Sequence, residues 1–266
     1  MTISNPPTPG SALRLYAHPR RESLNDRLFR KGTEALAEHY TVSTSDLYAQ
    51  DFDPVLRESD LGDLAADSGN VGELLGEAHA RGELTAEVQA EQAKLAAAEL
   101  LIIQFPLWWY GMPAILKGWF DRVLTSGFAH GDLDPDLGVP RRYGDGGLSG
   151  RRALVVVTAG EDARSIGSRG VSGDLDALLF PLTHGMLWFT GIETLDLHVI
   201  HDAESLDGPG VDQEVERLRS RLAGLHTEPS RPYRRLRDGD YQGTRALHPE
   251  LRPGRTDLAI HLAGHE

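Results

Sequence analysis

The chain of 266 residues contains no cysteine, and this absence removes several kinds of chemistry at once. Disulfide bonds, thiolate zinc sites and a cysteine nucleophile are all excluded, because each of them needs a thiol group. The absence fits a protein that works in a reducing compartment, so we expect a cytoplasmic location.

The sequence also lacks the segments that take a chain to a membrane or to a nucleic acid. No apolar run approaches the length of a membrane-spanning helix, and the polar, proline-rich start MTISNPPTPGSA has no signal-peptide core. The net charge of -13 and the pI near 5.3 argue against a nucleic-acid groove, because phosphate binding needs clustered Lys and Arg. We therefore expect neither membrane insertion nor nucleic-acid binding.

Four common catalytic and nucleotide-binding motifs are missing as well. The chain has neither the G-x-G-x-x-G of dinucleotide folds nor the G-x-x-x-x-G-K-[ST] loop of phosphate-binding NTPases. A G-x-S-x-G nucleophile elbow is absent, and His184, His198 and His201 are scattered without H-E-x-x-H spacing. We expect no metal site and no serine hydrolase.

What is present is an alternation of apolar segments with helical patterns. Strands are predicted at 13–17, 41–47, 99–105, 152–160 and 195–200. Helices are predicted from Ser23 toward Tyr40, over 85–98, from Pro113 at the first helical position to Leu124, over 174–190 and over 211–225. This order predicts an α/β fold: a doubly wound, five-stranded parallel sheet with helices on both faces.

The remaining segments suggest how the domain is bounded. We expect a flexible N-terminus over 1–12 and one domain over 13–227, in which the acidic, weakly helical stretch 57–98 is an insertion. Residues 228–266 show little period and form an irregular C-terminal extension, which is either disordered or packed on a partner subunit.

In an open parallel sheet, ligands bind beyond the carboxyl ends of the strands, so three loops should converge: 18–25, 105–112 and 158–172. The first loop precedes a helix start, where free N–H groups, Ser23, Asn25 and His18 can hold a phosphate. The alternative is an ordinary capped helix.

The other two loops suit a flat ring system such as isoalloxazine. Trp108, Trp109 and Tyr110 are consecutive and cannot all face one interior, so they offer a stacking surface. The third loop offers backbone donors at 158–160 to a ring edge that gains negative charge, and its alternative is a flexible connection.

Several ordered blocks resemble one known family. They are QFPLWWYGMPAILKGWFDRVL (104–124), SDLYAQDFDPV, AEQAKLAAAELLI, GRRALVVVTAG and GVSGDLDALLFPLTHGMLWFTG, all between Leu13 and Asp196. These blocks resemble the NAD(P)H:quinone reductase (DT-diaphorase) family. The resemblance implies a flavodoxin-like fold, a homodimer with shared active sites and a flavin, with FAD favoured over FMN because the segment 57–98 is long.

The activity that this resemblance implies is a two-electron, ping-pong transfer of hydride from NAD(P)H through the flavin to quinones or related aromatic acceptors. Two alternatives stay open. One keeps the flavin and takes azo, nitro or biosynthetic aromatic compounds as acceptors. The other is a flavin-binding regulatory subunit that docks on a membrane transporter.

Carried over by position, the resemblance implies a set of flavin contacts on three sides. On the phosphate side these are His18, Ser23, Leu24 and Asn25; on one flank of the ring, Pro106, Leu107, Trp108, Trp109 and Tyr110; on the other, Thr158, Ala159 and Gly160. Trp109 and Tyr110 would also border the quinone pocket, together with His130 and with Phe189 from the facing subunit.

The sequence departs from the family in the third loop. The family commonly has a Tyr and a His there, but the matching positions are Ile166 and Ser172. We hypothesise that backbone donors at 159 and 160, with Arg164 or Arg169 and Ser172, replace the missing pair electrostatically.

Two further positions carry predictions by resemblance. His130 stands where many relatives have Tyr, and it is either a proton donor to the substrate or part of the pocket wall. In the C-terminal extension, Tyr233, Arg234, Arg235 and Tyr241 are candidates to contact nicotinamide phosphates.

Overall fold

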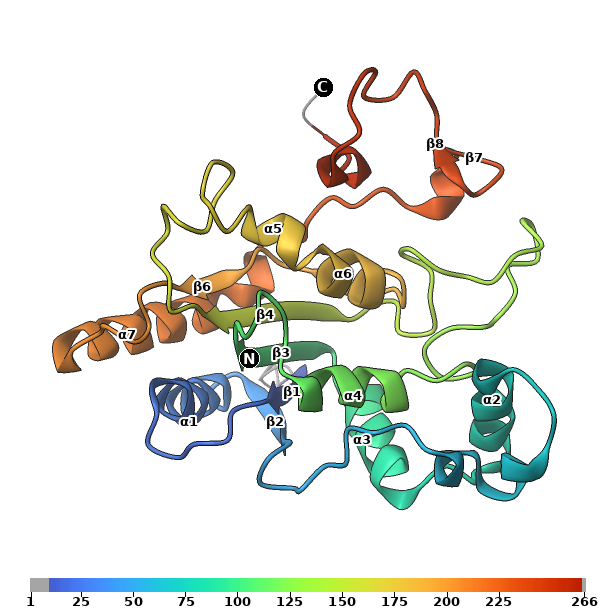
Figure 1. Cartoon of the computed structure of the whole chain (residues 1–266), viewed down its shortest axis with the longest axis horizontal. Coiled ribbons are helices and arrows are strands. Elements are labelled where there is room, and N and C mark those ends of the chain that lie inside the picture. The colour runs from blue at the N-terminus through green and yellow to red at the C-terminus, as the bar shows by residue number, and fades with distance from the viewer. Residues whose placement is uncertain (1–9, 265–266) are drawn as a thin grey trace, which may run out of the picture.

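A computed structural model describes residues 10–264, which form a parallel sheet flanked by helices (Figure 1). The strands lie in the order β2 (Tyr40–Asp46), β1 (Gly10–Tyr16), β3 (Leu100–Pro106), β4 (Arg152–Thr158) and β5 (Glu193–Thr194). All neighbours pair in parallel, and β6 (His198–Ile200) also pairs with β4. This is the flavodoxin-like order, so the predicted fold is confirmed.

The register brings the carboxyl ends of the central strands to one edge. Tyr16 pairs with Gln104, and Pro106 pairs with Thr158. The loops that follow β1, β3 and β4 therefore begin side by side, as the sequence predicted. Every residue of β3 is buried, which explains why its sequence is a continuous apolar run and not an alternating one.

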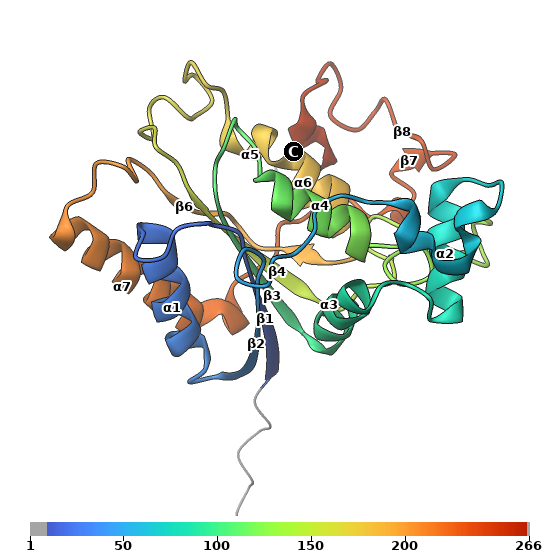
Figure 2. The ribbon, with the colours of Figure 1, turned by 60° about the horizontal axis from the view of Figure 1, so that its bottom comes forward.

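Helices cover both faces of the sheet. α1 (Leu24–Leu36) and α7 (Gly208–Gly224) pack on one face through leucines such as Leu28 and Leu218, whereas α3 (Ala86–Ala97) and α4 (Ala114–Val123) cover the other (Figure 2). The helix α4 begins one residue later than predicted, since Pro113 is its N-cap.

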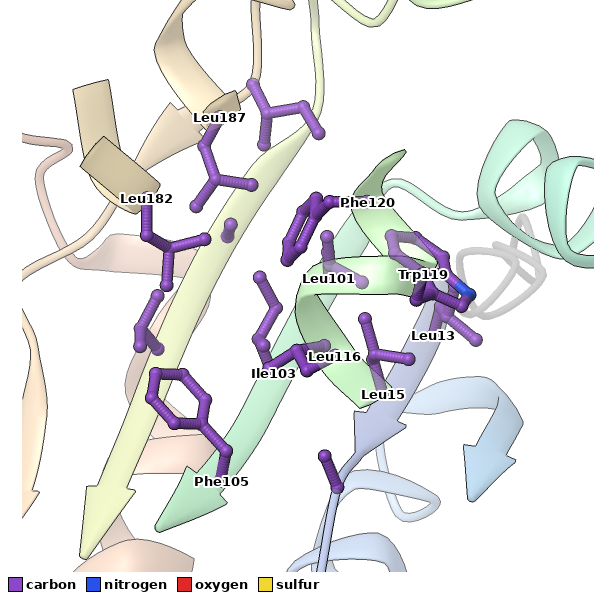
Figure 3. Close-up of a cluster of buried hydrophobic side chains, with 14 of the residues drawn as sticks. Leu13, Leu15, Leu101, Ile103, Phe105, Leu116, Trp119, Phe120, Leu182 and Leu187 are labelled. Atoms are coloured by element: carbon purple, nitrogen blue, oxygen red, sulfur yellow. The ribbon is translucent and has the colours of Figure 1, made fainter. Parts of the chain in front are cut away.

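The larger core cluster lies between the sheet and α4 (Figure 3). Leu116, Trp119 and Phe120 of α4 lie over the strands, and Leu182 and Leu187 close the cluster from the side of β4. The Trp119 side chain is fully buried, and its indole N–H donates to Glu91 at 2.8 Å.

Two predicted elements are interrupted in the structure. Of the strand predicted at 195–200, only 198–200 is paired, as β6, and the paired segment β5 precedes the predicted range, because the chain leaves β4 after Thr194 and rejoins it at His198. The helix predicted at 174–190 consists of three segments: α5 (Leu175–Leu178), α6 (Phe180–Leu182) and a π-helical turn, η2 (Thr183–Trp188). Pro181 has no N–H to continue a regular helix, and Leu179 between α5 and α6 leaves helical geometry.

The stretch 57–98 holds more helix than its sequence suggested. It contains the 3-10 segment η1 (Glu58–Ala66) and α2 (Val71–Arg81) before α3. These elements share a small apolar cluster of their own, formed by Leu61, Leu64, Leu74, Leu75, Ala78, Leu84 and Val88.

The C-terminal extension is ordered and packs on its own chain. After η3 (Leu225–Thr227) come η4 (Leu236–Asp238), the hairpin β7 (Tyr241–Gln242) with β8 (Ala246–Leu247), and η5 (Leu258–His261). Tyr233 is buried and its hydroxyl lies 2.9 Å from that of Thr183. The Trp188 indole donates to the Arg234 carbonyl at 3.1 Å, which fixes the extension over η2.

At the other end of the chain, β1 begins at Gly10, three residues before the predicted start at Leu13. Residues 1–9 of the expected flexible N-terminus lie outside the described residues. Within residues 10–264, no helix is both long and apolar enough to span a membrane.

Candidate active site

A pocket of about 450 Å³ opens at the carboxyl edge of the sheet, where the three loops meet. Its lining residues are His18, Arg20, Ser23, Leu24, Asn25, Pro106, Trp108, Thr158, Gly160, Ala203 and Glu204. The fold thus gathers eight of the twelve predicted cofactor-binding residues around one cavity. Leu107, Trp109, Tyr110 and Ala159 do not line it.

The start of α1 forms one wall of this pocket. Ser23 caps the helix by accepting a hydrogen bond from the Asp26 N–H at 3.1 Å, and its hydroxyl donates to the Arg20 carbonyl at 2.9 Å. His18 is half-buried and accepts from the Arg20 N–H at 3.2 Å, and burial lowers the pKa of His18. The capped-helix alternative is therefore realised, and the cap also faces the cavity.

Asn25 and Thr158 join α1 to β4 at the base of the pocket. The Asn25 amide donates to the Thr158 hydroxyl at 2.8 Å, and its main-chain carbonyl accepts from the Gln104 amide at 2.7 Å. The Asn25 Oδ1 atom is buried without a hydrogen-bond partner in the described part of the chain. Because a buried acceptor is costly to leave unsatisfied, this atom fits a donor group of a ligand.

The aromatic loop after β3 is held in an unusual backbone conformation. Trp109 and Tyr110 have φ angles of 50° and 61°, a region that bulky residues rarely adopt, and Trp108 and Gly111 close the turn with two backbone hydrogen bonds. The Trp109 side chain is 97% exposed, and those of Trp108 and Tyr110 are 42% exposed. As predicted, the three rings do not share an interior.

The third loop differs from the prediction at one backbone donor. The Ala159 N–H donates to the Ile200 carbonyl at 2.8 Å, so it is not free to donate to a ligand, and that part of the hypothesis is wrong. Gly160 does line the pocket. Ile166 is buried in the main core cluster, so its side chain serves packing and leaves no group at the site.

A carboxylate that the sequence reasoning missed follows directly after Gly160, which lines the pocket. Glu161 accepts a hydrogen bond from the Tyr110 hydroxyl at 2.9 Å and one from the Ser172 hydroxyl at 2.6 Å. The two hydroxyls lie 3.2 Å apart. We call these three side chains the Tyr110–Glu161–Ser172 cluster. The available signal was an acidic residue directly after the glycine turn TAG.

The arginines of this loop do not contact Ser172. Arg164 pairs instead with Asp162 at 2.5 Å, and this pairing holds the pKa of Asp162 well below its usual range. The side chain of Arg169 is exposed, and no hydrogen bond joins it to Ser172 within residues 10–264. Ser172 contacts Tyr110 and Glu161 instead, and the electrostatic role expected of Arg164 or Arg169 stays a prediction.

His130 and Phe189 contact each other, and neither lines the pocket at the carboxyl edge of their own chain. Their rings meet edge to face, with centroids 5.8 Å apart. Hydrogen bonds of their chain neighbours place the pair. The Gly147 N–H donates to the Ala129 carbonyl, and the Leu148 N–H donates to the Thr190 carbonyl. Gly147 and Leu148 lie shortly before β4 begins, and Thr190 lies shortly before β5 begins. The pair thus lies at the amino edge of the sheet. Burial lowers the pKa of His130.

The candidate residues of the extension already have partners within the chain. Arg234 binds Asp240 at 2.6 Å, Arg235 binds Asp145 at 3.3 Å, and the Tyr241 hydroxyl lies 3.0 Å from His261 Nδ1. Together with the buried Tyr233 they build the packing of the extension. A contact with nicotinamide phosphates stays a prediction.

Comparison with known proteins agrees with this geometry. A family model described as flavodoxin-like fold matches residues 11–222. A ribosyldihydronicotinamide dehydrogenase-like protein of Penicillium crustosum is 39% identical over 230 residues, which is 85% of each chain. NAD(P)H dehydrogenase (quinone) 1 of Rattus norvegicus is 35% identical over 222 residues, covering 82% of this chain and 78% of the relative.

A solved structure from Klebsiella pneumoniae, described as a quinone reductase, is similar over almost the whole length. It superposes with a TM-score of 0.87 at 38% identity, covering 96% of this chain and 100% of that chain. Fold and site therefore define a flavodoxin-like protein. Within that class, the chain belongs to the NAD(P)H:quinone reductase family, a family of oxidoreductases.

Proposed function

We propose that this protein is a flavin-dependent reductase that passes hydride from NAD(P)H to quinones or related aromatic acceptors. The observation that carries the proposal is the pocket at the start of α1, with its unsatisfied Asn25 Oδ1, beside a loop that presents Trp108, Trp109 and Tyr110 to solvent. Large exposed aromatics in a row are unusual on a protein surface unless a ligand or partner covers them.

The residues present fit a flavin. The start of α1 lines the pocket, where the N–H groups of a helix N-terminus can bind a phosphate, Asn25 offers an unpaired acceptor, and Trp108 offers an apolar face. A bound flavin supplies the hydride chemistry itself, because it accepts two electrons from one donor and gives them to another. We favour FAD over FMN on the family resemblance.

The protein's own contribution is binding, orientation and control of charge. The Asn25 and Thr158 side chains fix the base of the pocket, and Pro106 and Trp108 limit the access of water. The Tyr110–Glu161–Ser172 cluster holds two hydroxyl protons on a carboxylate next to Gly160 of the pocket. We assign to it the storage of a proton near the acceptor, a different task from the charge stabilisation expected of the missing Tyr and His.

We propose that the working unit is a homodimer with shared sites. Within one chain, His130 and Phe189 lie at the opposite edge of the sheet from Trp109, so they reach an acceptor on Trp109 only from a second copy. The 97% exposure of the Trp109 side chain supports a surface that a partner covers. The roles of His130 in substrate binding or proton donation, and the cytoplasmic location, stay predictions.

The decisive experiment starts with the coloured protein as purified. Its released cofactor is identified by absorbance and mass, and NADH and NADPH oxidation is then followed with quinones, azo compounds and nitroaromatics as acceptors. We expect FAD and turnover of at least one quinone. Turnover of azo or nitro compounds alone would show that these compounds, and not quinones, are the acceptors. A colourless protein that takes up neither FAD nor FMN would contradict the proposal.

A further inference from the structure

A positive charge without a negative partner is buried beneath the candidate site. Arg14, in the middle of β1, is 0% exposed and lies between the sheet and α1. No carboxylate forms an ion pair with it anywhere in residues 10–264, and its Nε and Nη1 atoms have no hydrogen-bond acceptor there. Its guanidinium lies 5.2 Å from the centroid of the Phe29 ring.

Such a group is expensive for the fold. Removing an ion from water destabilises the folded protein unless a counter-charge compensates it. The desolvation is large enough to lower the pKa of Arg14 to about 9. Space around the group is also tight, since a Cβ atom added to Gly32 would lie 2.7 Å from Arg14 Nη1. The sequence keeps a glycine in the interior of α1, although glycine is among the least favourable residues there.

A hydrogen-bonded path connects this charge to the pocket. Arg14 Nη2 donates to Gln104 Oε1 at 2.6 Å, and Gln104 Nε2 donates to the Asn25 carbonyl at 2.7 Å. A guanidinium can only donate, so it fixes which end of the Gln104 amide faces Asn25. Asn25 lines the pocket, is 6% exposed, and carries the unpaired Oδ1.

We propose that Arg14 is the internal counter-charge for an anionic ligand group in this pocket, and that through Gln104 it holds the main chain of Asn25 in place at the start of α1. The inference rests on the proposed function, in which the anionic group is the phosphate of a flavin nucleotide. Arg14 acts through Gln104 and through its field, and it does not touch the ligand.

The other charges around the pocket explain why an internal cation matters. Arg20 and His18 face the cavity from the β1–α1 loop, but Glu204 faces it from the opposite side and repels an anion. Arg21 is occupied by Asp46 at 2.7 Å. An exposed cation is screened by water and salt, whereas a buried one acts through a medium of low dielectric constant and is screened much less.

The test separates the phosphate from the ring. Riboflavin, FMN and FAD are titrated into the apoprotein of the wild type, Arg14→Met and Arg14→Lys, with binding read from flavin fluorescence and folding from Tm. Met keeps an unbranched apolar stem without the charge, and Lys keeps the charge. Arg27→Met is the matched control, since Arg27 is a partly exposed arginine of α1 that pairs with Asp212.

We expect Arg14→Met to weaken FMN and FAD about tenfold more than riboflavin, because one unit charge is lost near the phosphate. Arg14→Lys should recover most of that selectivity, and Arg27→Met should leave it unchanged. The Tm of the ligand-free Arg14→Met protein should equal or exceed that of the wild type, because an uncompensated buried charge has been removed.

Equal weakening of all three flavins, unchanged FMN binding, or an Arg14→Met protein that is less stable or fails to fold would each overturn the inference. If the wild type binds no flavin, the proposed function fails, and inorganic phosphate then decides the role of Arg14. A phosphate-induced rise in Tm that disappears in Arg14→Met would support it, and the absence of such a rise in the wild type would overturn it.

Discussion

Glu161 is the residue that most changes the expected chemistry of the site. Its carboxylate accepts both hydroxyl hydrogens of the Tyr110–Glu161–Ser172 cluster. A carboxylate near a ring that becomes negative on reduction disfavours that charge, which is the opposite of the cationic surroundings that the loop's arginines suggested. A flavin bound beside Glu161 would therefore have a lower midpoint potential than a flavin in a site lined by arginines.

The first prediction concerns this charge. Glu161→Gln keeps the shape of the side chain and removes its charge, so the midpoint potential of the bound flavin should rise. The expected shift is ~30 mV, which corresponds to about 1.4 kcal/mol for a two-electron couple. Redox titration against reference dyes measures it, with exposed Glu38→Gln as the control. An unchanged potential in Glu161→Gln would show that this carboxylate does not act on the ring.

The second prediction concerns acid sensitivity. His198 in β6 is 1% exposed, both of its ring nitrogens lack partners in the described residues, and burial lowers its pKa to about 3. The unfolded chain, with an ordinary histidine pKa near 6.5, binds this proton first, so stability is complete above about pH 6.5 and is lost as pH falls toward 3. At pH 5 the loss from this one residue should be roughly 1–2 kcal/mol.

Urea unfolding of the wild type and His198→Phe at pH 7 and pH 5 measures this contribution. The free energy of unfolding should fall less between the two pH values in the variant than in the wild type. The same change at exposed His39 should leave the difference as it is in the wild type. An identical fall in the wild type and His198→Phe would exclude His198 as a source of acid sensitivity.

At the scale of elements, a buried arginine joins the insertion 57–98 to the rest of the domain. Arg122 of α4 donates to Asp60 of η1 at 2.7 Å and to Glu87 of α3 at 2.5 Å, and both Arg122 and Asp60 are buried. The arginine also donates to the Asp53 carbonyl at 2.6 Å. One side chain therefore connects four segments of the chain.

The third prediction follows from this connection. Arg122→Met should destabilise the protein by about 3–5 kcal/mol, because it leaves the Asp60 carboxylate buried without its partner. The exposed pair Lys117–Asp121 on the same helix is the control, and Lys117→Met should cost about 1 kcal/mol or less. Chemical denaturation measures both. Equal losses for the two variants would mean that Asp60 reaches water when Arg122 is absent.

The same scale shows what the sequence could predict. Strand β3 and helix α4 were predicted nearly to the residue, because β3 is a continuous apolar run and α4 repeats its apolar residues on one face. The gap between β5 and β6 was not predicted, since Leu195 and Leu197 are apolar whether or not the backbone is paired. The extension was not predicted either, because its packing comes from single contacts such as Tyr233 with Thr183, which have no period.

The site was predictable where position on the fold decides it. Asn25, Trp108 and Thr158 follow strand ends or begin a helix, so the register of the sheet brings them together. Glu161 and Arg14 were missed for a different reason. Their importance lies in which atoms they meet, Ser172 in one case and Gln104 in the other, and these contacts depend on side-chain directions that a single sequence does not reveal.

At the scale of the whole molecule, the fourth prediction tests the shared sites. Trp109→Ala and Phe189→Ala homodimers should each lose about tenfold or more in kcat/KM with a quinone, while retaining their flavin. Co-expressed and tagged differently, the two variants form hybrid dimers with one intact site and one site that carries both changes. We expect the hybrid to recover about half of the wild-type activity.

Purified hybrid dimers assayed beside both parents measure this recovery. A hybrid no more active than its parents would mean that Trp109 and Phe189 do not meet across the interface. Size-exclusion chromatography with light scattering provides the control, because all three species should have the mass of a dimer.

The break between β5 and β6 has a consequence for how molecules of this protein meet one another. An exposed sheet edge recruits strands from other molecules when it offers a long row of unpaired N–H and C=O groups. Here the edge beyond β4 consists of pieces of two and three residues. Neither piece is long enough to template an added strand. Copies that meet along this edge at high concentration therefore cannot extend the sheet. Copies of the protein can then associate at this edge only through side-chain surfaces, which can be specific. The edge is protected from the strand-by-strand addition that produces fibres.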